Sequence, residues 1–272
     1  MIQLEEFFTH LAEFEHRSIF DDAQQIWDPL KNLGGTLRST LNATQAQHRE
    51  TLTGAVMVCG DDPSVRKMGS GFYVERWIVM ESAVYLEPCG ILIGAGTVLE
   101  PGAIIKGPAV IGAHCEIRQG AYIRGNVLVG DHCVVGHNTE VKNSIIMNHS
   151  EAGHFNYIGD SIIGSYVNLG AGSRLANVQF RSLEEKKNGF IHPIAIFLEG
   201  TVEDTGLSKF GSVLGDNVEI GCNAVLCPGT LMGADNWVYP NTTVPKGYYP
   251  VNRFVAPKDR KPRTQSKPLN TQ

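Results

Sequence analysis

The stretch IGAGTVLEPGAIIKGPAVIGAHCEIRQGAYIRGNVLVGDHCVVGHNTEVKNSIIM, residues 93–147, has an aliphatic residue or methionine at every sixth position. A smaller or β-branched residue stands two positions before most of these anchors. Alternate residues of a strand face the same side, so both sets are predicted to point into one core. A period of six predicts a parallel β-helix in which three hexads form one triangular coil. The anchors are Ile93, Leu99, Ile105, Ile111, Ile117, Ile123, Val129, Val135, Val141 and Met147, and the second set is Thr97, Ala103, Ala109, Cys115, Ala121, Val127, Cys133 and Thr139.

The rest of the chain is divided around this repeat. Residues 1–72 are predicted to be a helical segment and linker, with an apolar helix face from Leu4 to Phe14 and a helix stop at Gly34-Gly35. The β-helix is expected over residues 73–256, with an inserted loop at 180–209, and residues 257–272 are expected to be a disordered tail. The alternative, a β-sandwich, would show irregular strand lengths and hairpin turns.

The composition of the 272-residue chain excludes some function classes. It is 42% hydrophobic and 19% charged with a net charge of −5, which gives no reason to expect nucleic acid or a membrane surface as partner. No apolar run is long enough to cross a bilayer, and the acidic start does not resemble a secretion signal. None of the six cysteines forms a C-x-x-C pair. We therefore expect free thiols and a cytoplasmic protein.

The repeat changes after Met147. The period requires an apolar residue at 153, where the sequence has Gly153, and the next aliphatic anchor, Ile158, comes one residue early. A deletion of one residue reverses side-chain direction in a strand, so the change could direct His154 and Tyr157 into a surface groove. From the pattern alone, a tolerated kink with an incidental histidine is equally compatible.

Three basic residues are predicted to stack on the outer surface. Lys106, Arg124 and Lys142 follow one another at intervals of three hexads, which places them on successive coils about 4.8 Å apart. Like charges in directly opposed positions are destabilising. Either the three side chains extend separately into water, or they form a site for an anion such as a phosphate.

Residues 140–180, EVKNSIIMNHSEAGHFNYIGDSIIGSYVNLGAGSRLANVQF, resemble the acetyltransferase half of the bifunctional N-acetylglucosamine-1-phosphate uridylyltransferase/glucosamine-1-phosphate acetyltransferase family. The family pattern K-x9-A-G-H-x2-Y-[LI]-G-D fits Lys142 through Asp160, and N-[LI]-G-A-G fits residues 168–172. The resemblance implies a left-handed β-helix, a homotrimer, and acyl transfer from acetyl-CoA to the amine of an amino-sugar 1-phosphate, with no metal required.

The resemblance also implies roles for individual residues. In catalysis, His154 corresponds to the general base and Asn177 to a residue near the thioester. In substrate binding, Arg124 and Lys142 correspond to residues that hold the sugar phosphate, and Tyr157 and Asn168 to residues that contact the sugar. In cofactor binding, Cys222 stands where the family has a serine facing acetyl-CoA, Pro240 is assigned to the same site, and Arg253 corresponds to a residue that meets the coenzyme A phosphates. Backbone N–H groups of residues 168–172 are candidates for stabilising the oxyanion.

Some features depart from this family or allow other functions. No Gly-rich L-x-x-G-x-G-T-R-M loop occurs within residues 1–72, so we expect no uridylyl transfer. One alternative is a zinc enzyme of the γ-carbonic-anhydrase type, with ligands from His132 and His137 or from His149 and His154. Another is a non-enzymatic trimeric subunit that only binds a sugar phosphate.

Overall fold

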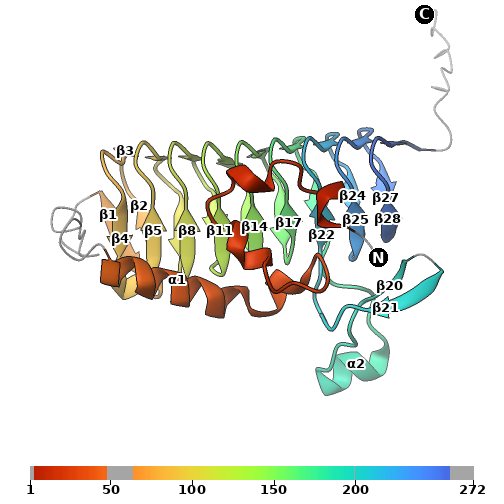
Figure 1. The fold of residues 1–272 in the computed structure, drawn as a ribbon. Coiled ribbons are helices and arrows are strands. Elements are labelled where there is room, and N and C mark those ends of the chain that lie inside the picture. Colours follow the sequence, from red (N-terminus) through yellow and green to blue (C-terminus); the bar gives the residue numbers. More distant parts are fainter. Residues whose placement is uncertain (1–2, 48–63, 199, 258–272) are drawn as a thin grey trace, which may run out of the picture.

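The computed structural model describes residues 3–47, 64–198 and 200–257, and Figure 1 shows them as one elongated body. Three nine-stranded sheets form the sides of a left-handed β-helix, which confirms the predicted fold class. Neighbouring strands are parallel except at the start of the helix, where β1–β2, β2–β7, β3–β6 and β4–β5 pair antiparallel. The part of the linker at 48–63 and the predicted tail from 258 lie outside the described residues.

The three sheets are named A, B and C. Sheet A consists of β1 (Val65–Met68), β2 (Gly71–Val74), β7 (Ile104–Lys106), β10 (Tyr122–Ile123), β13 (Glu140–Lys142), β16 (Tyr157–Gly159), β19 (Arg174–Leu175), β24 (Val225–Leu226) and β27 (Thr243–Val244). Sheet B consists of β3 (Ile78–Val79), β6 (Val98–Leu99), β9 (Glu116–Ile117), β12 (Val134–His137), β15 (Glu151–His154), β18 (Asn168–Leu169), β23 (Glu219–Ile220), β26 (Trp237–Val238) and β29 (Phe254–Val255). Sheet C consists of β4 (Val84–Leu86), β5 (Ile91–Ile93), β8 (Ala109–Ile111), β11 (Val127–Val129), β14 (Ser144–Ile146), β17 (Ile162–Ile163), β22 (Ser212–Leu214), β25 (Thr230–Met232) and β28 (Gly247–Tyr249).

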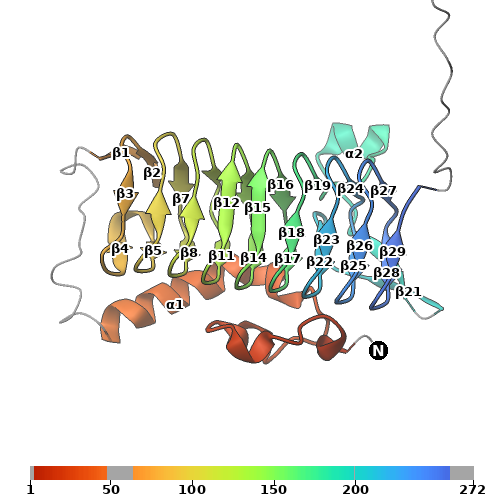
Figure 2. The same ribbon diagram turned by 90° about the horizontal axis from the view of Figure 1, so that it is seen from above.

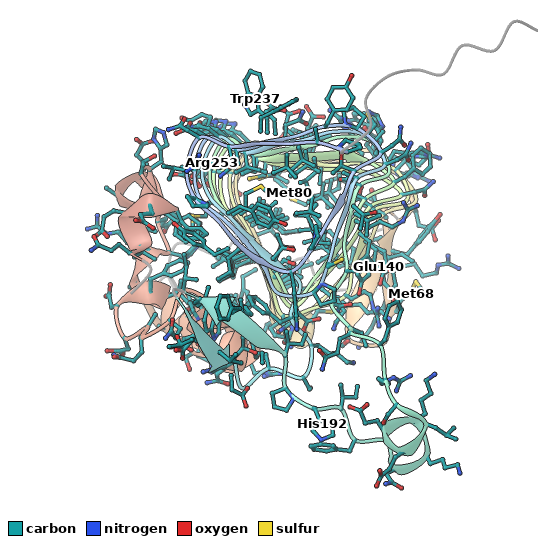
Figure 3. All side chains as sticks on the ribbon, turned by 90° about the vertical axis from the view of Figure 1, so that its right-hand side faces the viewer. Met68, Met80, Glu140, His192, Trp237 and Arg253 are labelled. Atoms are coloured by element: carbon teal, nitrogen blue, oxygen red, sulfur yellow. The ribbon has the colours of Figure 1, made fainter. Side chains whose placement is uncertain are left out.

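The inward residues form one continuous core along the axis. All anchors from Ile93 to Val141 are at most 1% exposed, and so are the residues two positions before them. The prediction that both sets point inward is therefore confirmed. Figure 3 looks along the axis and shows the triangular section, with Met80 inside it and Trp237 and Glu140 outside.

The change in repeat occurs before Met147, not at Gly153. In one coil the turn between sheets A and C uses two residues with positive φ, Gly125 and Asn126, whereas in the next coil it uses only Asn143. That coil and the one after it are each one residue shorter than three hexads, so Val134 pairs with Glu151 and Glu140 with Tyr157. The prediction that Met147 is the inward anchor is wrong, because the shorter turn makes Ile146 the inward residue.

The same shift removes the predicted defect at Gly153. Ala152, only 3% exposed, is the inward residue of β15. A β-carbon added to Gly153 would meet only the end of Arg118, at 4.0 Å. Gly153 therefore faces outward and gives up no core contact.

A second apolar cluster covers the outer face of sheet C. The central outward residues of its strands are buried beneath the N-terminal segment, which Figure 2 shows running along this side of the β-helix. The strand residues are Val110, Leu128, Ile145, Ile162, Val213 and Leu231, and the covering residues include Phe7, Phe8, Phe14, Phe20, Ile26, Trp27, Leu30, Leu33, Leu37 and Leu41.

The N-terminal segment is less α-helical than predicted. Its first part consists of 3-10 turns at η1 (Leu4–Glu6), η2 (Leu11–Glu13), η3 (Arg17–Phe20) and η4 (Asp28–Asn32), and only α1 (Leu33–Gln47) is an α-helix. The carbonyls of Glu6 and Phe7 accept from the N–H groups of Ala234 and Asp216. Carbonyls inside an α-helix bond within the helix, so docking on the coil turns favours short turns here.

The predicted helix stop at Gly34-Gly35 is also wrong, since both residues lie in the first turn of α1. A β-carbon on Gly34 would lie 2.4 Å from the Asn126 side-chain oxygen. Gly34 therefore permits the close packing of α1 against the β-helix and does not end α1.

A short 3-10 turn, η6 (Glu87–Cys89), lies between β4 and β5.

The insertion between β19 and β22 divides into an arm and a docked hairpin. The arm carries α2 (Leu183–Asn188), with a capping box between Ser182 and Glu185, and projects from the body in Figures 1 and 3. The hairpin of β20 (Ala195–Leu198) and β21 (Thr201–Asp204) adds Ile194, Ile196 and Leu198 to the cluster on sheet C. Among the described residues, no helix is long and apolar enough to cross a membrane.

Candidate active site

The cations predicted to stack do lie on successive coils of sheet A. Ile105, Ile123 and Val141 are partners in register, so the residues that follow them, Lys106, Arg124 and Lys142, form a column, which we call the cation column. Each cation has a partner of its own. Lys106 Nζ donates to the Tyr122 hydroxyl at 2.8 Å, Arg124 Nη1 to Glu140 Oε1 at 2.6 Å, and Lys142 Nζ to Asp160 Oδ2 at 2.9 Å.

No bound anion is needed to offset the repulsion expected in the column, because each cation already has a partner of its own. These pairs also leave binding capacity, because a guanidinium has five N–H donors and an ammonium has three. The hydrogen bond to Glu140 raises the pKa of Arg124 further above its ordinary value. Both side chains are partly exposed, 43% for Arg124 and 21% for Lys142, so both can still reach a ligand.

A buried carboxylate, Asp160, organises the end of this column. Asp160 is 5% exposed, and its Oδ2 accepts from both Lys142 and the Asn177 side-chain amide. Its Oδ1 accepts from Asn143 Nδ2 at 3.0 Å. The Tyr157 hydroxyl donates to Asn177 Oδ1 at 3.3 Å, so three of the predicted site residues, Lys142, Tyr157 and Asn177, belong to one network.

The network is packed against the backbone at Gly159. A β-carbon there would lie 2.6 Å from the Tyr157 hydroxyl and 2.7 Å from Asn177 Nδ2. Burial, followed by the charges of Glu140 and Asp160, raises the pKa of Tyr157 above its usual value. Tyr157 therefore remains a neutral hydrogen-bond donor at neutral pH.

The sequence analysis assigned no role to Asp160 or Asn143. The signal was present, because Asp160 follows Lys142 at the same sequence interval that defines the cation column. The shorter coils place Gly159 in register with Lys142 and move Asp160 into the following turn, where its φ is +48°. Only the folded chain shows that this turn directs the carboxylate back to Lys142.

His154 lies at another corner, where sheet B turns into sheet A. It is exposed, it ends β15, and its side chain makes no hydrogen bond to the described part of the chain. Its backbone is fixed, because its N–H donates to Asn156 Oδ1 and its carbonyl accepts from Gly172 N–H. The backbone that carries the imidazole is therefore held in place, and within the described residues neither ring nitrogen has a hydrogen-bond partner. In the described residues no direct contact joins it to Arg124 or Lys142.

Two of the three predicted cofactor residues, Cys222 and Pro240, lie in the same column as His154. The bonds from Gly172 N–H to His154, from Asn223 N–H to Ala171 and from Asn241 N–H to Cys222 place His154, Ala171, Cys222 and Pro240 on successive coils. At about 4.8 Å per coil, Cys222 is about 10 Å from His154 along the axis. The structure thus brings the predicted base and two predicted cofactor residues onto one edge.

An apolar groove of about 650 Å³ opens along this edge and over sheet B. Its lining includes three predicted residues, Asn168, Cys222 and Pro240, and the exposed aromatic side chains of Trp237, Tyr239 and Phe254. The Cys222 thiol is free and exposed. Asn168 donates to Glu219 Oε2 at 2.9 Å. Arg253, exposed beside the groove, is outside its lining, and Figure 3 shows it at the C-terminal end near Trp237.

The suggested oxyanion donors are only partly available. The N–H groups of Asn168, Gly170 and Gly172 donate to the carbonyls of Val218, Ile220 and His154. These three donors already have partners within the β-helix, so the prediction is wrong for them. They hold the coils together and keep the His154 backbone in place.

Three other histidines form a stack at a different corner. His114, His132 and His149 are stacked with ring centroids 5.1 and 4.8 Å apart, and Tyr166 continues the stack at 4.7 Å from His149. His137 is in register with His154, one coil earlier. Among the described residues, no group of three or more His, Cys, Asp or Glu side chains is placed to hold a metal ion.

Comparison with known proteins gives matches over the central coils. The family described as the GMPPB C-terminal domain matches residues 105–232. A bifunctional sugar-1-phosphate nucleotidylyltransferase/acetyltransferase of Sulfurisphaera tokodaii is 37% identical over 109 residues, 40% of this chain and 25% of that protein. The bifunctional protein GlmU of Methanococcus vannielii is 36% identical over 111 residues, 41% of this chain and 24% of that protein.

The chain thus spans about a quarter of the length of these curated relatives. Among solved structures, the acetyltransferase domain of PglB from Neisseria gonorrhoeae is 14% identical, with a TM-score of 0.28 and coverage of 61% of this chain and 57% of that one. The sequence relatives are the stronger matches. Over about 110 residues, this chain is similar to a part of these sugar-1-phosphate nucleotidylyltransferase/acetyltransferase and GlmU proteins, and over residues 105–232 it is similar to the GMPPB C-terminal domain.

Proposed function

We propose that the protein transfers an acyl group from acetyl-CoA to the amine of an amino-sugar 1-phosphate, with glucosamine 1-phosphate as the first substrate to test. The observation that carries the proposal is the column in which His154 lies two coils before Cys222 and three before Pro240, the latter two of which line the apolar groove. The name of the Sulfurisphaera tokodaii relative, which includes acetyltransferase, agrees with it.

His154 acts as the general base. An ammonium group is not nucleophilic, and a neutral imidazole can take the proton as the amine nitrogen attacks the thioester carbonyl. The exposed His154 ring has both nitrogens available, and its fixed backbone limits the positions it can take. The tetrahedral intermediate then collapses with release of the coenzyme A thiolate, which gains a proton.

Arg124 and Lys142 bind the phosphate without giving up their carboxylate partners, because each has unused N–H donors. Tyr157 and Asn168 contact the sugar, and Asn177 lies near the thioester. Asp160 is a positioning residue, since it holds Lys142 and Asn177 through one oxygen. Binding at the phosphate would orient the amine for attack.

The acyl donor occupies the apolar groove. Its volume of about 650 Å³ suits a ligand larger than a sugar phosphate. Cys222 and Pro240 line the groove and lie in the same column as His154, and Arg253 lies outside the lining, in a position to meet a phosphate of the coenzyme. The free Cys222 thiol stands beside this path, and alkylation of Cys222 would block the donor if the assignment is correct.

The protein is proposed to act as a homotrimer. Trp237, Tyr239 and Phe254 are 60%, 47% and 53% exposed on the outer face of sheet B. Such aromatic patches are typical of protein interfaces. Light scattering on the full chain measures the assembly directly, and a monomer at micromolar concentration would contradict a stable trimer.

The decisive experiment is an assay of thiol release from acetyl-CoA with glucosamine 1-phosphate as acceptor. We expect release that depends on the acceptor and falls by about 10²–10⁴-fold in His154→Ala. His132→Ala is the matched control, because this histidine is also exposed but belongs to the stack at another corner. Full activity in His154→Ala would remove His154 from the mechanism. Acceptor binding without any thiol release would favour a non-enzymatic binding subunit.

A further inference from the structure

A second cavity lies beneath α1, away from the apolar groove. Its volume is about 410 Å³, and three separate parts of the chain line it: the end of η4 with the start of α1, the turns between sheets A and C, and the connection from β21 to β22. Its lining includes Lys31, Arg38, Lys209, Asn126, Asn143 and Asp160. A pocket of this size can hold a small phosphate-bearing molecule.

The charged groups around this cavity are mainly positive. Lys31, Arg38 and Lys209 contribute three cations, and Asp160 is the one carboxylate in the lining. Lys31 is paired with Asp28 at 2.7 Å. Within the described residues, neither Arg38 nor Lys209 has a salt-bridge partner, and the only hydrogen bond of the Arg38 side chain goes to the Gly34 carbonyl, at 3.2 Å. Within the part of the chain that the structure describes, two of the three cations in the lining therefore have no carboxylate partner.

The inner wall supplies further donors and little negative charge. Asn126 and Asn143 are half-buried, and Asn126 makes no side-chain hydrogen bond to the described residues. The two Asp160 oxygens already accept from Lys142, Asn177 and Asn143. The groups still free are thus an amide and two cations, and this set matches an anion with several acceptor oxygens.

The three cations converge on the same space. The Lys31 ammonium lies near Gly206, because a β-carbon added to Gly206 would be 3.8 Å from Lys31 Nζ. Lys209 is three residues after Gly206 in the same connection. α1 carries Arg38 and packs on Asn126 through Gly34. The N-terminal segment, the coil turn and the insertion must therefore all be in place before the cavity exists.

From this arrangement we propose that the cavity is a second ligand site, which binds a phosphate group through Arg38, Lys209 and Asn126. The phosphate belongs to free inorganic phosphate or to a small phosphate monoester. The site is distinct from the proposed substrate position at Arg124 and Lys142, and the two share only Asp160 as a common wall.

The test is titration calorimetry on the full chain in phosphate-free buffer of constant ionic strength. One arm uses inorganic phosphate and the other uses glucose 1-phosphate, a monoester without an amine; tighter binding in one arm identifies the source. We expect saturable binding that persists in Arg124→Gln/Lys142→Gln, which removes the proposed substrate position. Arg38→Gln/Lys209→Gln should weaken it by about tenfold or more for each cation removed.

The control Lys186→Gln/Lys187→Gln removes the same charge from α2 and should leave this affinity unchanged. Lys209→Gln alone serves if the double variant does not fold, and about tenfold weaker binding is expected. Equal affinity in the cavity variants and the control would overturn the proposal. The proposal would also be overturned if Arg124→Gln/Lys142→Gln lost all phosphate binding while Arg38→Gln/Lys209→Gln kept its full affinity. That result would support the proposed function.

Discussion

Sheets A and C each have nine short strands and share one inward core, yet the outer face of sheet A is open and that of sheet C is buried. The outward residues of sheet C are aliphatic and carry the N-terminal segment, whereas those of sheet A include Tyr122, Glu140, Tyr157 and Arg174. Both sheets belong to the same coiled backbone, so the outward side chains of each coil decide whether the outer face is open or covered. In this fold the inward residues specify the coil, and the outward residues determine what each face binds.

The largest expected effect comes from the covered face. Ile145→Ala, at a fully buried outward position of sheet C, should cost about 2–5 kcal/mol in free energy of unfolding, because it leaves a cavity beneath the N-terminal segment. Val225→Ala, at an outward position of sheet A, is the matched control and should cost about 1 kcal/mol or less. Urea unfolding measures both, and equal losses would contradict the comparison.

A smaller effect distinguishes two ion pairs on the open face. Asp160→Asn removes the charge of the buried carboxylate. It also places an NH₂ donor where Asp160 now accepts hydrogen bonds, so we expect the free energy of unfolding to fall by about 1–3 kcal/mol. It should also raise the KM for glucosamine 1-phosphate, because Lys142 and Asn177 lose their position. Glu140→Gln breaks the more exposed pair with Arg124 and should cost about 1 kcal/mol or less. Equal costs would mean that Asp160 does not organise the network.

The smallest effect concerns how pH acts on the docked segment. Burial lowers the pKa of His16 below its ordinary value of 6.5, and the nearby Glu15 and Asp131 oppose this shift only in part. The unfolded chain then binds the proton more readily, so stability is complete above pH 6.5 and falls as the pH drops through the lowered pKa. Thermal unfolding from pH 7.5 to 5 should show this loss. His16→Gln should reduce the slope, and an unchanged slope would exclude His16 as its source.

Much of the fold could be predicted because the hexad is a direct consequence of coil geometry. Every coil must return two apolar side chains per sheet to the axis, so the anchors and the vertical alignment of Lys106, Arg124 and Lys142 follow from spacing alone. The change at Met147 could not be predicted in the same way. Ile145, Ile146 and Met147 are all apolar, and only the one-residue turn at Asn143 selects Ile146 for the core.

The candidate site was predictable to a similar, partial extent. Spacing aligned the cations, and the resemblance selected His154 and the residues around it. The interval of the cation column also runs from Lys142 to Asp160, but it did not show that the carboxylate turns back to Lys142, nor that Glu140 pairs with Arg124. The roles of the individual site residues stay predictions that the experiments above can test.

The sequence by itself determined the β-helix, its axis and the residues that fill it, because a period of six leaves no other regular way to bury the anchors. The tertiary structure decided how the remaining parts attach. In residues 3–32 the carbonyls of Glu6 and Phe7 bond to coil turns far away in sequence and the chain forms short 3-10 turns, and Gly34 lies inside α1, where the helix packs closely on Asn126. Such choices depend on partners distant in the chain, which no local pattern contains.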